Sequence, residues 1–233
     1  MISGRPFHFP PSSLRETMGL DSLARSTALL CLLLWCPSLT EVALPAEFGD
    51  VELSAYALSN WPRDLEIFNQ GTTVPGPIQN GLGAGLKVGL FPAVLRRIVG
   101  LEIDSNAHSG ALSFPNIANG RVNEIGRSDL LVSTTTFNLV LRYPSGMIRP
   151  YIGIGLGWSR GTLLNPNIAG RDDKDFDAAH ALAHQFFGGA QILLSPKVFL
   201  FGEYRYFLSN YHWEGLNIDF RTHYGLVGAG LHF

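Results

Sequence analysis

The stretch RTHYGLVGAGLHF, residues Arg221–Phe233, decides the fold. Counted back from the carboxyl terminus, every second residue is apolar: Phe233, Leu231, Ala229 and Val227. The residues between them are mostly small or polar, as in a β-strand with one apolar face and one roomy face. The same pattern recurs along the chain, and no helical stretch is long enough to cover such a face. We therefore expect the apolar face to meet lipid and this strand to close a transmembrane β-barrel.

Eight strand-like segments of this kind follow one another. Gly81–Phe91 is the clearest, because leucine, valine and alanine alternate there with four glycines and a lysine. The eight segments are Val51–Ser59, Gly81–Phe91, Ile98–Asp104, Leu131–Tyr143, Pro150–Ser159, Ala183–Leu193, Lys197–Phe207 and Thr222–Phe233.

The connections between these segments alternate in length. Asn60–Asn80, Ser105–Leu130, Arg160–Leu182 and Leu208–Arg221 are long, whereas the three between them are short and carry turn residues such as Pro and Gly. This alternation predicts an all-β fold: an eight-stranded antiparallel up-and-down transmembrane β-barrel with four longer external loops and short periplasmic turns. An even number of strands places both termini on the periplasmic side.

The N-terminal region predicts export. An apolar run, Ala28–Trp35, follows Arg25 and is too short for a membrane-spanning helix of about 20 residues, as in a secretory signal. We expect residues 1–46 to be an N-terminal extension and cleaved signal peptide for the Sec pathway, with residues 47–233 forming the barrel. Both cysteines lie in the first segment, so the mature chain would have none, which suits the outer membrane of a Gram-negative bacterium.

The composition limits the possible partners. Charged residues make up 15% of the chain and the net charge is -2, which gives no indication of nucleic-acid binding. If the apolar faces meet lipid, the polar faces point into the barrel. They carry a set of residues that we expect to form an interior charge network: Glu52, Lys87, Glu102, Asn138, Arg142, Glu203 and Arg205, with Gln185 and Gln191.

The interior of an eight-stranded barrel is just wide enough to be filled by side chains, so these acids and bases should interlock. A symmetric turn would set Lys87 directly opposite Glu102, and Glu203 and Arg205 lie two residues apart on one face. The network is then a structural plug. The alternative is a narrow or gated water path through the same residues.

Aromatic residues stand at the ends of several apolar faces. Tyr143 and Phe233 fall at the expected periplasmic ends of their strands, and Trp158 and Tyr206 at the expected external ends. Two interfacial aromatic girdles would account for this placement. The alternative is that aromatic residues are simply good strand formers.

Enzymatic motifs are weak. His212 with Glu214 lies in the last external loop, and an acidic run, Asp172–Asp177, lies in the third, but its spacing lacks the glycine and final glutamate of a calcium-binding EF-hand loop. No CxxC, phosphate-binding or dinucleotide motif is present. We expect no catalytic residue, no metal site and no cofactor.

Three segments carry a family resemblance: RPYIGIGLGWSRG at 149–161, LFGEYRYF at 200–207 and THYGLVGAGLHF at 222–233. They resemble the small outer-membrane β-barrel proteins of the OmpA-like transmembrane class. The resemblance implies outer-membrane lipids and lipopolysaccharide as surroundings. It also implies periplasmic chaperones and the barrel-assembly machinery as partners during biogenesis, with the final aromatic, Phe233, as the assembly signal.

Together these features predict a non-enzymatic integral outer-membrane protein with a role in envelope integrity or in display of its loops at the cell surface. A narrow, porin-like channel is the main alternative, and a lipid-modifying barrel enzyme is a weaker one. A soluble lipocalin-like barrel, with its apolar face inward, is disfavoured because inward glycines, lysine, glutamate and arginine would make a poor apolar pocket.

Overall fold

The computed structural model describes residues 49–63, 65–69, 72–76, 79–118, 121–164, 176–213 and 216–233. The expected signal peptide, residues 1–46, lies outside these ranges. Eight long strands form the barrel: β1 (Gly49–Pro62), β4 (Gly81–Pro92), β5 (Val99–Ala118), β6 (Arg121–Arg142), β7 (Ile148–Leu164), β8 (Phe176–Leu193), β9 (Val198–Trp213) and β10 (Leu216–His232). A hairpin of β2 (Leu65–Asn69) and β3 (Thr72–Gly76) and a 3-10 turn, η2 (Ala93–Leu95), complete the elements.

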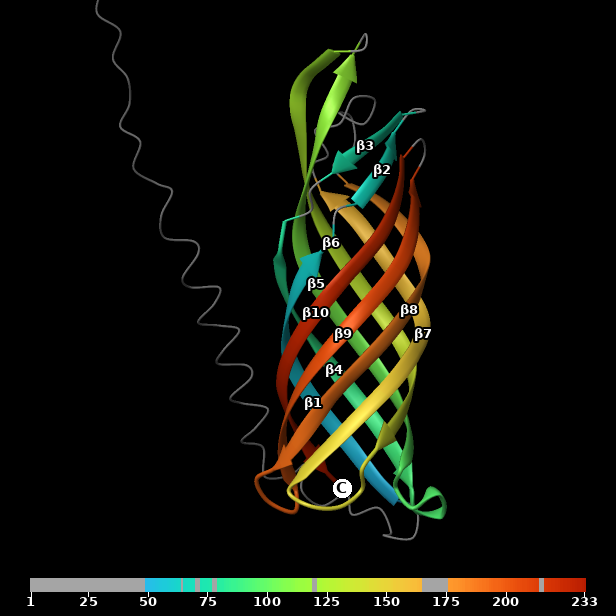
Figure 1. Ribbon diagram of the computed structural model, residues 1–233, viewed down its shortest axis with the longest axis vertical. Coiled ribbons are helices and arrows are strands. Elements are labelled where there is room, and N and C mark those ends of the chain that lie inside the picture. Colours follow the sequence, from blue (N-terminus) through green and yellow to red (C-terminus); the bar gives the residue numbers. More distant parts are fainter. Residues whose placement is uncertain are drawn as a thin grey trace, which may run out of the picture. The chain divides into compact units, whose positions relative to one another are not determined.

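The eight long strands close into an antiparallel up-and-down barrel (Figure 1). Each pairs with its neighbours in the chain, and β1 pairs with both β4 and β10, which joins the first strand to the last. The expected fold is thus confirmed, including the closing role of the C-terminal strand between β1 and β9. The β2–β3 hairpin pairs with the start of β10 and extends the sheet beyond the barrel. No helix in the described part of the chain is long and apolar enough to cross a membrane.

The lower part of the barrel, nearest the short turns, has an apolar outer surface. On β7 the outward residues are Ile148, Pro150, Ile152, Ile154, Leu156 and Trp158, and most of them are more than half exposed. About 11 residues at ~3.3 Å each, tilted by about 40°, span roughly 28 Å along the membrane normal, close to the ~25 Å apolar band of outer-membrane barrels. This band therefore has the height that a lipid bilayer requires.

Above this band the strands continue, and the two faces change in character, although buried polar residues such as Asn60 and His108 and exposed apolar ones such as Phe176 remain. The outward residues become polar, as at Ser105, Ser109, Asn210 and Arg221. The inward residues become apolar and aromatic, and they pack into one buried cluster that includes Leu58, Leu130, Val132, Leu163, Phe207, Tyr211, Trp213, Ile218, Phe220 and Tyr224. The upper barrel therefore has an aromatic-rich interior and a more polar outer surface than the lower part.

This change explains where the expected strand boundaries are wrong. At the turn end the expected and observed boundaries agree within two residues. At the opposite end seven of the eight strands run further than expected, most of all β5, which reaches Ala118 where the sequence pattern indicated an end at Asp104. Much of the expected loop Ser105–Leu130 is strand, because β5 and β6 stay paired up to Ala118 and Arg121.

Candidate functional site: the barrel interior

Asp104 and Arg205 form the centre of the interior charge network. Arg205 Nη2 lies 2.6 Å from Asp104 Oδ2, which links β9 to β5 across the lumen. The hydroxyl of Tyr56, on β1, donates to Asp104 Oδ1 at 2.6 Å. Arg205 also binds Glu203, two residues before it, with 2.7 Å between Nη2 and Oε1. The two acids, Asp104 and Glu203, are buried, and so is Arg205, which binds both. These ion pairs are therefore shielded from water.

Lys87 extends the network to β4. Its ammonium lies 2.6 Å from Glu203 Oε2 and 3.6 Å from Glu102 Oε1. Tyr151 donates to the same Glu203 oxygen at 2.9 Å, and the amide of Asn138 donates to Glu102 at 2.8 Å. Three carboxylates thus share two cations, and neutral donors supply the remaining hydrogen bonds. Ion pairing and hydrogen bonding of this kind offset the free-energy cost of burying charged groups.

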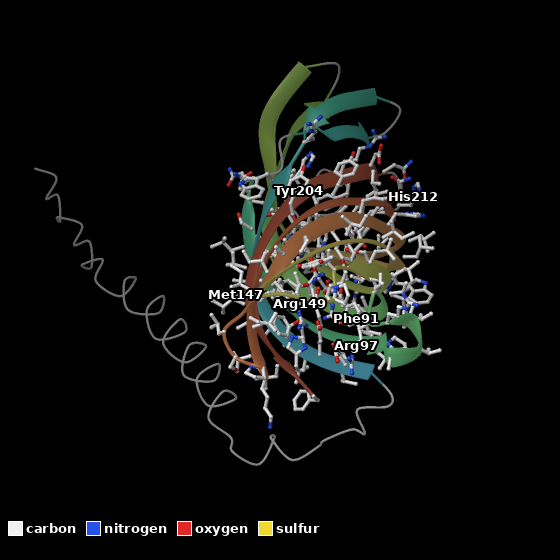
Figure 2. All side chains as sticks on the ribbon, turned by 60° about the horizontal axis from the view of Figure 1, so that its bottom comes forward. Phe91, Arg97, Met147, Arg149, Tyr204 and His212 are labelled. Carbon is white, nitrogen blue, oxygen red and sulfur yellow. The ribbon has the colours of Figure 1, made fainter. Side chains whose placement is uncertain are left out.

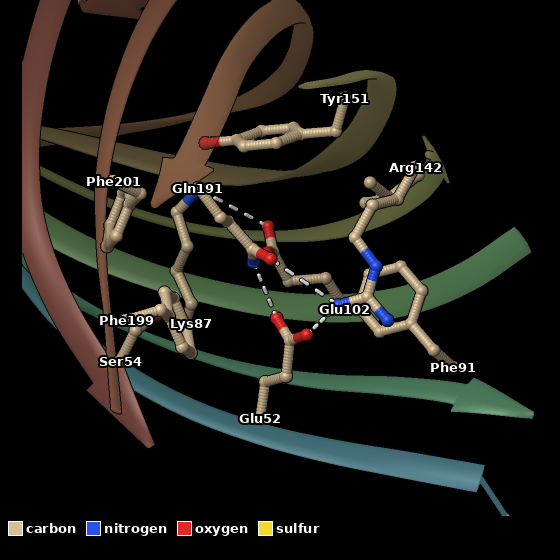
Figure 3. Close-up of a pocket in the computed structure, with 11 residues that line it drawn as sticks. Glu52, Ser54, Lys87, Phe91, Glu102, Arg142, Tyr151, Gln191, Phe199 and Phe201 are labelled. Atoms are coloured by element: carbon tan, nitrogen blue, oxygen red, sulfur yellow. Dashed lines mark hydrogen bonds and ion pairs between the residues drawn. The ribbon is translucent and has the colours of Figure 1, made fainter. Parts of the chain in front are cut away.

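A second cluster lies closer to the short turns, around Arg142. Its guanidinium binds Glu52 on β1 and lies 3.0 Å from Asp50 Oδ2. Gln191, on β8, donates to Glu52 Oε2 at 2.8 Å. The Arg142 guanidinium also stacks on Phe91, with 3.7 Å between the Cζ atom and the ring centroid. Figure 3 shows this arrangement, with Glu52, Gln191 and Arg142 meeting beside Phe91.

The two clusters leave little open space between them. The cavity lined by both has a volume of about 20 Å³. A single water needs about 10–15 Å³ on this scale, so the cavity holds one or two waters. The aromatic cluster above the network adds a second filled layer.

The structure brings together all nine residues expected in the interior, in two groups. The first group is Lys87, Glu102, Asn138, Gln185, Glu203 and Arg205, and the second is Glu52, Arg142 and Gln191.

The expected direct opposition of Lys87 and Glu102 is wrong. Lys87 stands opposite Asp104, and Glu102 stands opposite Gly89. The turn between β4 and β5 runs from Ala93 to Ile98, one residue further along the chain than expected, and this shifts the register by two residues. Lys87 reaches Glu102 only diagonally, and its shorter contact is to Glu203 on the far wall.

Two inward glycines of β10 make room for aromatic side chains. Gly228 and Gly230 lie against the rings of Phe201 and Phe199. A Cβ at Gly230 would lie 2.3 Å from Phe199 Cζ. The space beside these glycines is filled by aromatic rings, because β9 places the two phenylalanines inward, closer to the short turns than Glu203 and Arg205.

The four aromatic residues expected at the membrane interfaces lie on the outer face. Tyr143 and Trp158 are well exposed, and Tyr206 and Phe233 are partly exposed. Trp158 and Tyr206 lie within β7 and β9 rather than at their ends, because both strands continue above the apolar band.

Sequence reasoning missed several interior partners. Asp104 was placed on the polar face but not in the network, and Tyr56, Tyr151 and Asp50 were not considered as partners. All four lie on inward or turn-end positions. Their contacts join strands that are not neighbours, and only the closed barrel reveals those.

Of the weak enzymatic candidates, His212 and Asp177 lie in the described residues. In the described ranges no three His, Cys, Asp or Glu side chains lie close enough to hold a metal ion. His108 is buried and bonded to Tyr224 at 2.8 Å between Nε2 and the hydroxyl. Glu214, Asp172, Asp173 and Asp175 lie outside the described residues.

Comparisons with solved structures support the fold. The barrel is similar to neisserial surface protein A (TM-score 0.54, 12% identity, 79% of this chain and 99% of that chain). It is also similar to OprG from Pseudomonas aeruginosa (TM-score 0.56, 15% identity, 80% and 97%) and to AlkL in lipid bilayers (TM-score 0.50, 14% identity, 82% and 94%). No family model matches the chain, and no curated protein matches it.

The chain therefore has the fold of the small outer-membrane β-barrels of Gram-negative bacteria. Location in the outer membrane follows from this fold together with the apolar outer band, because a closed barrel leaves no strand edge unpaired in lipid.

Proposed function

We propose that the protein is a non-enzymatic integral outer-membrane barrel of the OmpA-like transmembrane class, with a structural role in envelope integrity or in display of its longer loops. The observation that carries this proposal is the filled interior. Two charge clusters and an aromatic layer occupy the lumen, and the cavity among the charges is about 20 Å³. A barrel packed in this way serves as a rigid membrane anchor.

The proposed partners follow from the outer surface and from the C-terminal strand. Outer-membrane lipids and lipopolysaccharide would surround the apolar band. During biogenesis, after export by the Sec pathway, periplasmic chaperones and the barrel-assembly machinery would handle the chain. Phe233, the proposed assembly signal, exchanges backbone hydrogen bonds with Val51 at the seam of the barrel.

Membrane insertion is tested by extraction of the full chain from outer membranes. A closed barrel should migrate differently on a gel before and after boiling, because the unboiled barrel stays folded in detergent. Recovery only from the soluble periplasm would contradict the proposal.

The channel alternative is tested in planar lipid bilayers. We expect the folded wild-type protein to give no conductance steps, because Lys87, Arg142 and Arg205 and their partners block the lumen. Steady conductance of the wild type would contradict the plugged lumen and support the channel alternative. A larger porin, whose lumen is an aqueous channel, is measured in the same bilayers as the positive control.

A further inference from the structure

A buried histidine joins three strands near the external end of the barrel. His108, on the inward face of β5, is 2% exposed. Its Nε2 atom lies 2.8 Å from the hydroxyl of Tyr224 on β10, and its Nδ1 atom lies 3.3 Å from the amide nitrogen of Asn60 on β1. Neither strand is a neighbour of β5, so both contacts reach past β4. The imidazole therefore lies within the aromatic layer of the upper lumen, against Phe220 and Tyr224.

Two glycines of β4 leave room for these contacts. Gly83 stands opposite His108 in the strand register, and a Cβ there would lie 2.5 Å from the Cβ of His108. Gly81 stands opposite Asn60, and a Cβ there would lie 2.9 Å from Asn60 Oδ1. A side chain at either position would fill the space between the two residues. The missing side chains of β4 therefore allow His108 and Asn60 to meet.

The hydrogen bonds around His108 fix which ring nitrogen carries the proton. The backbone N–H of Gly81 donates to Asn60 Oδ1, so the amide oxygen faces Gly81 and the amide nitrogen faces His108. Nδ1 must then accept a hydrogen bond from Asn60. The proton of the neutral ring therefore lies on Nε2, which donates to the hydroxyl of Tyr224. The row of hydrogen bonds from Gly81 to Tyr224 is complete only when the imidazole is neutral.

Protonation of His108 would break this row of hydrogen bonds. The second proton can be added only at Nδ1, where it would point at the N–H donors of Asn60. Rotation of the Asn60 amide would turn its oxygen toward the imidazolium, but the same rotation would take that oxygen away from Gly81. Gly81 is the first residue of β4, at the end of the connection from β1. Loss of its bond to Asn60 would therefore loosen the point at which this connection enters the barrel wall.

The surroundings of His108 offer no free acid among the described residues. Asp104, four residues away on the same strand, already accepts hydrogen bonds from Arg205 and Tyr56. The neighbouring strands, β4 and β6, place a glycine and a valine opposite His108. The titratable groups that the other strands bring to this region are Tyr56 on β1, Tyr224 on β10, and Arg205 and Tyr211 on β9. Burial in these surroundings lowers the pKa of His108 to about 4.

We propose that His108 makes the external end of the barrel sensitive to acid: protonation of its imidazole releases the start of β4, and with it the connection between β1 and β4. His108 lies above the apolar band, which ends on β5 at Ile103, toward the end of the barrel that His212 marks in Figure 2 and away from Arg97. The released connection is therefore an external one. Such a barrel is more than a passive anchor, because the surface that it displays changes with pH.

The direction of the pH dependence follows from two pKa values. An exposed imidazole binds its second proton below about pH 6.5, whereas the buried His108 binds it only below about pH 4. The released form therefore takes up the proton more readily than the closed form. The closed form is fully favoured above about pH 6.5 and loses stability as the pH falls. Release is expected near pH 4, where the buried imidazole becomes charged.

The test is NMR spectroscopy of the isotope-labelled full barrel folded in maltoside micelles. The ring signals of His108 and the amide signals of Gly81 and Gly157 are followed from neutral pH to about pH 3. We expect His108 and Gly81 to change together near pH 4, whereas Gly157, on β7, stays constant. A Gly81 signal that is unaffected while His108 titrates would refute the proposal. An equal change at Gly157 would refute it too, because the whole barrel would then be unfolding.

The variant His108→Gln cannot gain charge, so its Gly81 signal should stay constant in acid. The matched control, His232→Gln, removes a histidine that packs against Phe199 in the lumen near the short turns, and it should keep the transition. Persistence of the transition in His108→Gln, or its loss in His232→Gln, would place its origin elsewhere and overturn the proposal.

The variant Asn60→Asp tests the same contact in a chain that keeps the histidine. The new carboxylate can accept from the N–H of Gly81 and from a protonated Nδ1 at the same time, and a nearby opposite charge raises the pKa of an imidazole. His108 should then titrate at a higher pH than in the wild type, and Gly81 should stay bonded when it does. A Gly81 signal that still changes together with the His108 ring would mean that the release does not depend on Asn60, which would overturn the proposal.

Discussion

Lys87 is held between carboxylates from different parts of the barrel, Glu102 on the neighbouring strand and Glu203 on the far wall. The alternation of polar and apolar residues was enough to predict that all three point inward. The partners were not predictable, because they depend on the strand register and on the curvature of the closed barrel. A turn displaced by one residue along the chain placed Asp104, and not Glu102, opposite Lys87.

Lys87→Met should lower the free energy of unfolding by about 3 kcal/mol, because a buried ion pair that loses one partner leaves a charge uncompensated. The measurement is urea unfolding of the barrel folded in lipid vesicles. The double variant Lys87→Met/Glu102→Gln should recover part of the loss, because it removes one of the three carboxylates. Ser105→Ala, on the outer face, is the control and should be nearly neutral. A neutral Lys87→Met would contradict the interior network.

Among the elements, β10 shows how much of a strand the sequence can reveal. Its period-2 pattern correctly predicts the closing strand, its two neighbours and its outer face. Its first residues, before Thr222 in the sequence, were assigned to a loop, because polar residues such as Asp219 and Arg221 lie on the outer face there. The expectation that every second residue is apolar holds for the lipid-facing part of a strand. It fails where the same strand continues beyond the membrane.

Gly230→Ala should destabilise the barrel by about 1–3 kcal/mol, because the new methyl group would overlap the Phe199 ring. Ala229→Val, on the outer face of the same strand, is the matched control and should be tolerated. Combining Gly230→Ala with Phe199→Leu should recover stability in the same unfolding assay. No recovery would mean that the glycine is needed for another reason.

Phe233→Ala should reduce the yield of assembled barrel in cells more than it reduces stability. The side chain is only partly buried, and its backbone bonds to Val51 remain in the variant. Unfolding of the refolded variant should therefore change by less than about 1 kcal/mol. Leu231→Ala, on the same face of β10, is the control, and an equal effect of both variants on yield would remove the special role of the terminal aromatic.

At the scale of the whole barrel, its described residues form two regions along the axis. The lower region has an apolar outer surface and charges inside, and the upper region has a more polar outer surface and an aromatic-rich interior. The sequence predicted the lower part well, because its outer face follows one rule throughout. It did not predict the upper part, in which that rule does not hold and the connecting segments pair as strands.

This division predicts which tryptophans contact lipid. In vesicles that contain brominated acyl chains, the fluorescence of Trp158 should be strongly quenched, because its side chain is exposed at the apolar band. Trp213 should be protected, because it is buried in the upper core. Variants that keep Trp158 or Trp213 as the sole tryptophan, with Trp35 and Trp61 also replaced by Phe, separate the signals. Equal quenching of both would contradict the division.

The ion pairs that cross the lumen have a consequence for the time course of folding. The contacts of Lys87 with Glu203 and of Asp104 with Arg205 form only when β9 joins the barrel, and Glu52 needs Arg142 and Gln191 from β6 and β8. These contacts join residues about a hundred positions apart, and such distant contacts slow folding. A chain that entered the membrane strand by strand would carry uncompensated charges into lipid. Insertion and completion of the barrel are therefore expected to occur together, in one late and cooperative step.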